Sequence, residues 1–320
     1  MKKASSSVVP VGVFGVGSLG EHHARIYRQM TQARLVGVYD AHAERAAAVA
    51  EKYGTRAFAT PEALAAEVRA ASVVAPTHLH HAVAAPLLER GLHLLVEKPI
   101  AATTAEAESL VALARSKNLI LQVGHVERFN PVLDYLERLG GAPRFIEAHR
   151  LAPYPAPRAG GLPPRGTEVS VVLDLMIHDL EVILHLVDAP VTQIHAVGVP
   201  VLSPTADIAN VRLSFANGCV ANVTASRISQ ERLRKIRVFF SDSYLSLDYM
   251  NQAGAVHRRT PQGIQCEKVP IEREEPLALE LESFIRCVDR HDDPVVSGEQ
   301  AARALRLAMD IHERMRQGPS

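Results

Sequence analysis

The sequence predicts an α/β protein with two parts: a doubly wound parallel sheet, then a second α+β domain with a large, mostly antiparallel sheet. Three observations predict this. Apolar strands alternate with helical segments over the first 124 residues, a glycine-rich turn joins the first strand to the first helix, and closely spaced strands follow residue 190. We therefore expect domains over residues 1–124 and 125–320, with the final helices able to pack back on the first domain.

The first domain repeats the order strand, turn and helix. A doubly wound sheet of six parallel strands accounts for this alternation. Glycine or proline marks several helix ends: Gly54 and Gly91 follow helices, and Pro61 opens one. The strands that can be located are 8–14, 35–39, 71–75, 93–96 and 119–123, and the longer helices are 42–53, 80–90 and 105–116.

The glycine turn has the spacing of a dinucleotide-binding loop. It reads Gly15-Val16-Gly17-Ser18-Leu19-Gly20, and Asp40 ends the next strand twenty positions later. Gly15 permits the tight turn, Gly17 the approach of a pyrophosphate, and Gly20 close packing of helix on strand. We predict Ser18 and Leu19 as cofactor-binding together with these glycines, because the phosphates would lie at the helix N-terminus. Asp40 can accept hydrogen bonds from ribose hydroxyls and would repel a 2′-phosphate, which favours NAD over NADP. The alternative is an Asp40 that serves only as a turn residue.

Further candidate residues follow other strands of this predicted Rossmann sheet. Thr77, Glu97 and Lys98 all stand at strand ends, where doubly wound sheets bind their ligands. We predict Thr77 and Glu97 as cofactor-binding residues. The Lys98 ammonium could donate to a substrate oxygen and stabilise its alkoxide character during hydride transfer. The alternative is a surface lysine before the turn at Pro99.

The second domain is predicted as helices around an antiparallel sheet. Asn130 and Pro131 suit a helix start, residues 152–170 hold five prolines and three glycines, and Asn217-Gly218 marks a hairpin. The helix at 171–187 could cover one face of the sheet, and a second subunit could cover the other. The expected strands are 145–151, 192–201, 208–215, 219–226, 235–240, 244–248 and pieces of 255–269, with tail helices at 276–291 and 297–317.

The helix at 171–187 carries a second candidate site. Asp174 and His178 are four positions apart and so share one helical face. An aspartate beside an imidazole fixes its tautomer and favours its protonated form, which suits a group that accepts a proton from an alcohol. A structural pair with no catalytic role is the alternative.

Composition excludes several classes of protein. Lys+Arg and Asp+Glu each number 35, and the pI is near 7.3, so a nucleic-acid binder is disfavoured. Three cysteines without a CxxC pair argue against a disulfide framework or zinc cage. The histidines do not converge as metal ligands should, since His80 and His81 diverge on a helix. No stretch suits a membrane span, and cysteines without a pairing pattern fit a reducing compartment, so we expect a cytoplasmic protein. From the positions of the histidines we expect no bound metal.

Taken together, these motifs resemble the Gfo/Idh/MocA family of sugar and inositol dehydrogenases. The resemblance rests on the glycine turn, Thr77 with His80, Glu97-Lys98-Pro99, and Asp174 with His178. It implies that Lys98, Asp174 and His178 form the catalytic group and that Thr77 and His80 lie near the nicotinamide ribose. It covers nearly the whole chain.

Several stretches are similar to the UDP-N-acetylglucosamine 3-dehydrogenases of bacterial lipid A biosynthesis: 124–131, 145–153, 164–167, 172–179 and 218–226. That resemblance implies NAD-dependent oxidation of the sugar C3 hydroxyl, a downstream aminotransferase, and a homo-dimer or homo-tetramer. A proline-rich insertion at 153–163 departs from the pattern. The rivals are a dehydrogenase of a free sugar, inositol or other polyol, and a regulator that only senses nucleotide.

A nucleotide sugar needs cations for its diphosphate. We predict Arg128, Asn130 and Arg165 as substrate-binding residues, and each arginine could instead be a solvated surface residue. The arginines of the second half that could supply the cations are Arg128, Arg150, Arg158, Arg165 and Arg227.

Overall fold

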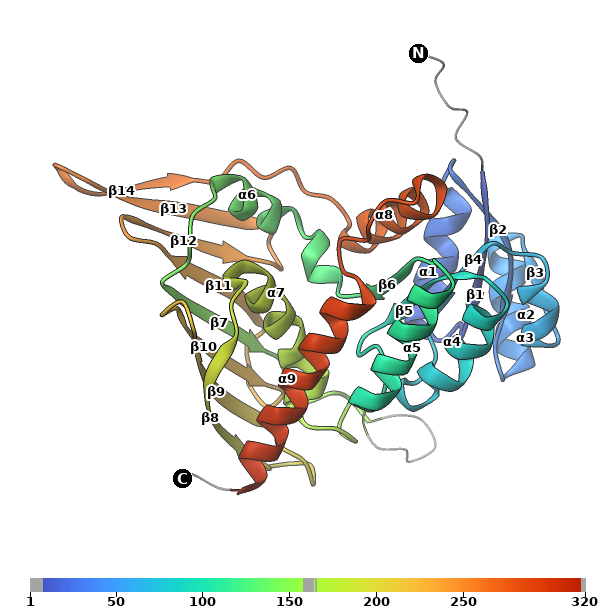
Figure 1. Ribbon diagram of the computed structural model, residues 1–320, viewed down its shortest axis with the longest axis horizontal. Coiled ribbons are helices and arrows are strands. Elements are labelled where there is room, and N and C mark those ends of the chain that lie inside the picture. Colours follow the sequence, from blue (N-terminus) through green and yellow to red (C-terminus); the bar gives the residue numbers. More distant parts are fainter. Residues whose placement is uncertain (1–7, 158–163, 165, 318–320) are drawn as a thin grey trace, which may run out of the picture. The chain divides into compact units, whose positions relative to one another are not determined.

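The computed structural model describes residues 8–157, 164 and 166–317. It divides the chain into two compact units (Figure 1). The first unit comprises the chain up to Val126 together with Glu275–Ala302. The second comprises Glu127–Glu274 and the chain from Arg303 onward.

The first unit is built on a six-stranded parallel sheet with the order β3-β2-β1-β4-β5-β6. The predicted doubly wound sheet is therefore confirmed, and the strand order reverses between β1 and β4. The third strand has only two residues, which explains why periodicity does not locate it. The strands are β1 (Val9–Phe14), β2 (Ala33–Tyr39), β3 (Arg56–Ala57), β4 (Ala70–Val73), β5 (His93–Glu97) and β6 (Leu121–Gly124).

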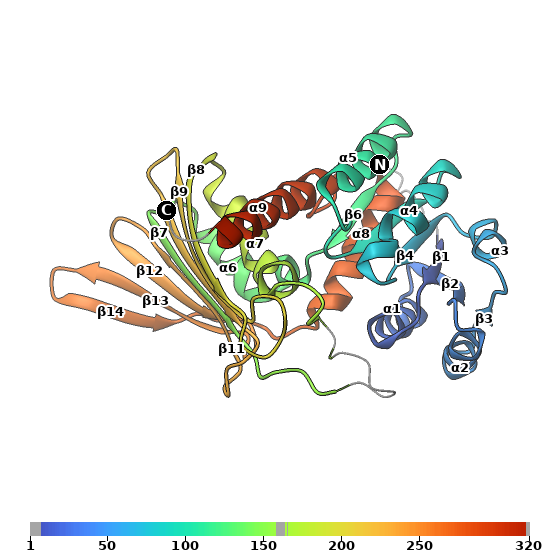
Figure 2. The ribbon, with the colours of Figure 1, turned by 90° about the horizontal axis from the view of Figure 1, so that it is seen from below.

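Helices cover both faces of this sheet (Figure 2). On one face, Tyr27 of α1 and Phe284 of α8 join a buried cluster with Val11 and Val13 of β1. The α5 N-terminus is capped by Thr103, with Glu106 completing a capping box. The helices are α1 (Ser18–Gln29), α2 (Ala43–Tyr53), α3 (Pro61–Ala65), α4 (His80–Glu89), α5 (Thr104–Ser116) and α8 (Pro276–Arg290).

The second unit contains an eight-stranded sheet with the order β14-β13-β12-β11-β7-β10-β9-β8. Only β7 and β10 pair in parallel, so the predicted mostly antiparallel sheet is confirmed. The hairpin between β9 and β10 turns at Gly218, whose φ of +83° favours glycine. The strands are β7 (Phe145–Leu151), β8 (Val191–Val199), β9 (Ile208–Phe215), β10 (Val220–Ser226), β11 (Leu233–Phe239), β12 (Ser243–Asp248), β13 (Ala253–Thr260) and β14 (Gly263–Lys268).

One face of the large sheet carries the helices α6 (Pro131–Leu139) and α7 (Ile177–Val187) (Figure 2). The last helix, α9 (Gly298–Gln317), begins in the first unit and continues in the second, where Met315 lies against Gly198 of β8. The single α-helix expected at 171–187 is wrong in its first part, because Val172–Met176 forms a π-helical turn. The polar residues Asp174, His178, Glu181 and His185 follow α-helical spacing, so the sequence pattern gives no sign of the π-helical turn.

No helix in the described parts of the chain is both long enough and apolar enough to cross a membrane.

Candidate active site

The glycine turn between β1 and α1 is shaped by backbone contacts. A Cβ on Gly15, whose φ is +92°, would lie 2.6 Å from the Val74 carbonyl oxygen. One on Gly20 would lie 1.9 Å from the Gly15 oxygen, so only glycine allows this packing. A Cβ on Gly17 would meet no atom within 4 Å. The helix starts at Ser18, so its first backbone N–H groups lack helical partners and are available to an anion. The turn therefore fits a dinucleotide pyrophosphate.

Asp40 is tied directly to this turn. Its Oδ2 accepts the Val16 N–H at 2.8 Å and its Oδ1 accepts the His42 N–H at 2.9 Å. Because an ionised carboxylate offers about four acceptor positions, it can still receive ribose hydroxyls. Arg45 Nη1 lies 3.3 Å from Oδ1, a neighbour that spacing on α2 could have suggested but that the motif does not include.

Thr77 and His80 lie in the turn that follows β4. Thr77 is half-buried at the start of a 3₁₀ turn. His80 is 1% exposed, and its two ring nitrogens lie 2.8 Å from the carbonyl oxygens of Pro99 and Ala75. Burial lowers the pKa of His80, and these two carbonyls oppose that effect. His80 thus links the ends of β4 and β5.

Glu97, the last residue of β5, turns its carboxylate into the protein. Its Oε1 lies 3.1 Å from Nε2 of the fully buried His23, and its Oε2 accepts the Lys98 N–H at 3.3 Å. His23 Nδ1 in turn lies 3.1 Å from Ser72 Oγ, which also pairs with the Tyr27 hydroxyl at 2.8 Å. These contacts fix the backbone at Lys98, whose residue is half-buried. His23 and Ser72 were not predicted, since neither stands in a motif of the strand ends.

A second buried carboxylate lies near this network. Glu280 of α8 is fully buried, and neither of its carboxylate oxygens has a hydrogen-bond partner among the described residues. Burial and then the charge of Glu97 raise the pKa of Glu280 well above its usual range. This shift favours the protonated, neutral form of Glu280.

In the second unit, the π-helical turn carries Asp174, and His178 follows in α7; both side chains are half-buried. Gly166, with a φ of +85°, packs its backbone on Asp174: a Cβ there would lie 2.4 Å from Asp174 Oδ2. π-Helical turns inside α-helices occur frequently at functional sites. Lys98 belongs to the other unit, so the predicted catalytic residues are contributed by both.

The arginines predicted for an anionic substrate are mostly buried in ion pairs. Arg128 Nη1 donates to Glu181 at 2.8 Å. Arg150 binds Asp179 through two nitrogens and Glu127 through a third, at 2.7, 3.0 and 2.8 Å. Arg128, Arg150 and Arg227 are 2–8% exposed, so the alternative that they are solvated surface residues is wrong for these three. The interaction with their carboxylate partners offsets the desolvation free energy of the buried guanidinium groups.

Asn130 caps α6 by accepting the Val132 N–H at 3.4 Å, as the sequence predicts. Its amide donates to Glu127 and to the Tyr249 carbonyl oxygen. Arg158 and Arg165 lie outside the described residues. A role of Arg128, Asn130 or Arg165 in substrate binding therefore stays a prediction.

Within the described residues, no cluster of three or more His, Cys, Asp or Glu side chains has the arrangement of a metal site.

Comparison with protein-family models gives two matches. Residues 9–125 match the oxidoreductase family with an NAD-binding Rossmann fold, and residues 138–246 match the Gfo/Idh/MocA C-terminal domain. These matches fall on the two sheets described above.

Individual relatives agree. The chain is 39% identical over 307 residues to UDP-N-acetylglucosamine 3-dehydrogenase of Acidithiobacillus ferrooxidans, covering 94% of this chain and 95% of the relative. A solved structure of that enzyme superposes with a TM-score of 0.91, at 38% identity, covering 97% and 98% of the two chains. Myo-inositol 2-dehydrogenase of Thermotoga maritima is 25% identical over 319 residues, 93% of each chain.

A levoglucosan dehydrogenase solved with NADH shares the fold at 18% identity and a TM-score of 0.86, covering 97% of each chain. The glycine turn and Asp40 fit the same cofactor. From its two family matches and its similarity to a relative along nearly its whole length, the chain belongs to the Gfo/Idh/MocA family of NAD-binding oxidoreductases.

Proposed function

We propose that this protein oxidises the C3 hydroxyl of UDP-N-acetylglucosamine to the 3-keto sugar, with NAD as the oxidant. The observation that carries this proposal is the 39% identity to a 3-dehydrogenase of that substrate along 94% of the chain. The nucleotide-sugar class and a place in lipid A biosynthesis rest on the same similarity. A downstream aminotransferase would consume the ketone.

We assign the reaction to two groups of residues: Lys98, and the pair of Asp174 with His178. NAD, when bound, accepts the hydride. The Lys98 ammonium donates to the substrate oxygen and stabilises its developing negative charge. His178 accepts the hydroxyl proton, directly or through Lys98, and Asp174 orients the imidazole and stabilises its protonated form.

On the cofactor side, we assign the pyrophosphate to the turn from Gly15 to Gly20 and the ribose hydroxyls to Asp40. Thr77 remains a candidate for direct contact with the cofactor. His80 and Glu97, which we also predicted as cofactor-binding, use the side-chain atoms described above to hold the strand-end turns. Any contribution of these two to cofactor binding would act through the turns they support.

The test is to incubate the purified protein with NAD and UDP-N-acetylglucosamine, adding an aminotransferase and an amine donor to remove the ketone. We expect NADH absorbance at 340 nm to rise. Lys98→Ala and His178→Ala should each lower kcat by about two orders of magnitude or more, with NAD affinity nearly unchanged. Matched controls are Lys117→Ala and His195→Ala, which replace exposed residues and should keep wild-type rates.

The rival substrate class is a polyol, which the similarity to an inositol dehydrogenase favours. Binding of UDP to the protein saturated with NADH distinguishes the two, because only a nucleotide-sugar enzyme needs a second diphosphate site besides that of the cofactor. Turnover of myo-inositol without UDP binding would replace our proposal with the polyol activity. An NAD-binding protein that oxidises neither class would support the regulator.

We also propose that the face of the large sheet opposite α6 and α7 mediates assembly into a homo-dimer or homo-tetramer. Four rings form a ladder across neighbouring strands on that face: Phe145, Phe239, Tyr244 and His257. Successive ring centroids are 5.5, 4.9 and 4.2 Å apart. Tyr244→Glu should shift the mass measured by light scattering toward the monomer, because it would bury a charge at such an interface.

A further inference from the structure

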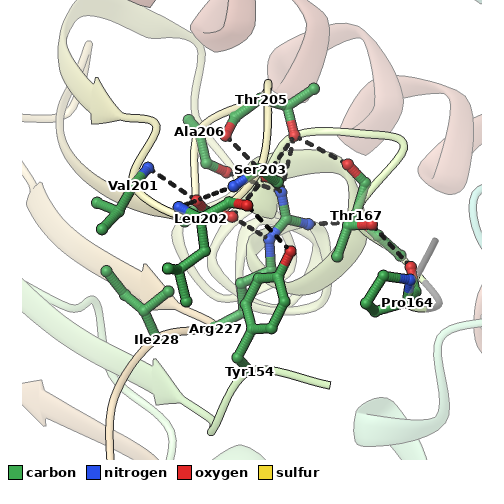
Figure 3. A network of polar contacts seen from close by, with 12 residues as sticks. Tyr154, Pro164, Thr167, Val201, Leu202, Ser203, Thr205, Ala206, Arg227 and Ile228 are labelled. Carbon is green, nitrogen blue, oxygen red and sulfur yellow. Dashed lines mark hydrogen bonds and ion pairs between the residues drawn. The ribbon is translucent and has the colours of Figure 1, made fainter. Parts of the chain in front are cut away.

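Arg227, which follows β10, is the centre of a buried polar network (Figure 3). It is 2% exposed, and all three guanidinium nitrogens donate hydrogen bonds. Nε donates to Asp207 Oδ1 at 2.8 Å. The other acceptors are the carbonyl oxygens of Gly166 (2.5 Å), Val169 (2.9 Å) and Ala206 (3.2 Å) and the hydroxyls of Ser203 (3.1 Å) and Thr205 (2.7 Å).

Asp207, fully buried, organises the loop between β8 and β9 around this arginine. Its Oδ2 accepts three backbone N–H groups, and its Oδ1 accepts the Ser203 hydroxyl as well as Arg227. Those hydrogen bonds hold the pKa of Asp207 well below its usual range although burial acts in the opposite direction. The three N–H donors are Val201, Leu202 and Ser203, at 2.8, 2.6 and 2.9 Å.

The same network reaches the segment that precedes the π-helical turn. The Thr205 hydroxyl has the Val169 and Thr167 carbonyl oxygens at 2.9 and 3.3 Å. The Val171 N–H donates to the Ala206 carbonyl oxygen at 2.9 Å. Two segments that are about forty positions apart are thus locked together by the guanidinium and the carboxylate beside it.

This locking has a direct consequence at Asp174. The Gly166 carbonyl that Arg227 holds belongs to the residue whose backbone packs on the Asp174 carboxylate. From the other side, the Asp174 N–H donates to the Ser170 carbonyl oxygen at 3.1 Å. A displacement of residues 166–170 would therefore move the surroundings of Asp174.

We propose that Arg227, paired with Asp207, is a positioning residue that fixes residues 166–171 and, through Gly166, the Asp174 carboxylate. The role in catalysis rests on the proposed function, in which Asp174 orients His178. A buried ion pair contributes little net stability compared with apolar packing of the same volume. The planar guanidinium fixes the relative positions of two segments, because its five N–H groups meet acceptors from both at fixed angles.

The mildest test removes one hydroxyl from the network with Thr205→Val. Its control, Thr192→Val, removes an exposed hydroxyl that bonds Ser214 in the same sheet. Thr205→Val should lower kcat for UDP-N-acetylglucosamine by about tenfold while KM for NAD stays unchanged. The acid limb of the kcat/KM profile should move to lower pH, because a displaced Asp174 stabilises protonated His178 less. Arg227→Lys should do the same more strongly, since one ammonium cannot meet acceptors from both segments.

Wild-type kcat and an unmoved pH profile in Thr205→Val would overturn the proposal, even if its unfolding temperature falls. Amide hydrogen exchange tests the positioning role of Arg227 independently of which substrate the protein oxidises. If the wild type does not oxidise UDP-N-acetylglucosamine, the proposed function fails. In that case faster exchange at Val171 and Asp174 in Thr205→Val than in Thr192→Val still supports the positioning role, and equal exchange rejects it.

Discussion

Glu280 allows the buried network around Glu97 to be tested without any substrate. Its carboxyl is fully buried without a hydrogen-bond partner in the described chain, and burial together with Glu97 raises its pKa well above the usual 4.5. Glu280→Gln keeps the shape of the side chain and removes its titration. The matched control is Glu282→Gln, an exposed carboxylate on the same helix.

The sign follows from proton linkage. Between 4.5 and the raised pKa, the folded protein binds one proton that the unfolded chain has released. The free energy of unfolding therefore falls as pH rises, by a little over about 1 kcal/mol per pH unit for this group. This contribution is fully present below pH 4.5 and is lost as pH rises through the folded-state pKa.

The assay is urea unfolding of wild type, Glu280→Gln and Glu282→Gln at several pH values between about 5.5 and 8. We expect the stability of Glu280→Gln to rise relative to that of the wild type as pH increases, by about 1 kcal/mol per pH unit below the folded-state pKa. Glu282→Gln should run parallel to the wild type. A difference between Glu280→Gln and wild type that does not change with pH would show that Glu280 is already ionised when folded, which would refute our account of this network.

Three further predictions concern single side chains. Asp40→Ala should shift the ratio of kcat/KM values from NAD toward NADP by about tenfold, because the charge that repels a 2′-phosphate is gone. Gly20→Ala should weaken NADH binding, measured by fluorescence, by about tenfold or more, because its Cβ would overlap the Gly15 carbonyl oxygen at 1.9 Å. Gly166→Ala should lower kcat by a similar factor and the unfolding temperature as well: a φ of +85° costs alanine about 1–2 kcal/mol, and the new methyl displaces Asp174. If the measured cofactor preference, NADH affinity or kcat of one of these variants equals that of the wild type, the role assigned to that residue is wrong.

The parts of the fold that the sequence predicts are those set by local rules. Strand positions follow from apolar runs, and helix ends follow from residues such as Gly54, which adopts the left-handed conformation after α2. The Asn217-Gly218 turn places β9 against β10 in the expected way. The π-helical turn at Val172–Met176 is not captured by these rules, because its hydrogen bonds span one residue more than those of an α-helix while the types of residue are the same.

At the candidate site, the residues that are predictable stand at strand ends next to recognisable turns. Their partners are not predictable, because they come from distant positions. His23 meets Glu97 across 74 positions, and Arg227 donates to the Gly166 carbonyl oxygen across 61. No spacing rule connects such pairs, since the tertiary fold alone brings them together.

The arginines show why this matters for function. A sequence supplies a count of cations, and a chain with several arginines in its second half invites an anionic ligand. Arginines that form buried ion pairs with carboxylates no longer count among the cations that can bind a ligand. These pairs are Arg128 with Glu181, Arg150 with Asp179, and Arg227 with Asp207. In each pair both members are nearly inaccessible to water, so the charge is compensated inside the protein and the fork-shaped guanidinium acts on its own chain. An arginine therefore indicates a ligand only after its carboxylate partners are known. In this protein the Arg227 guanidinium binds the backbone of Gly166, which packs on Asp174.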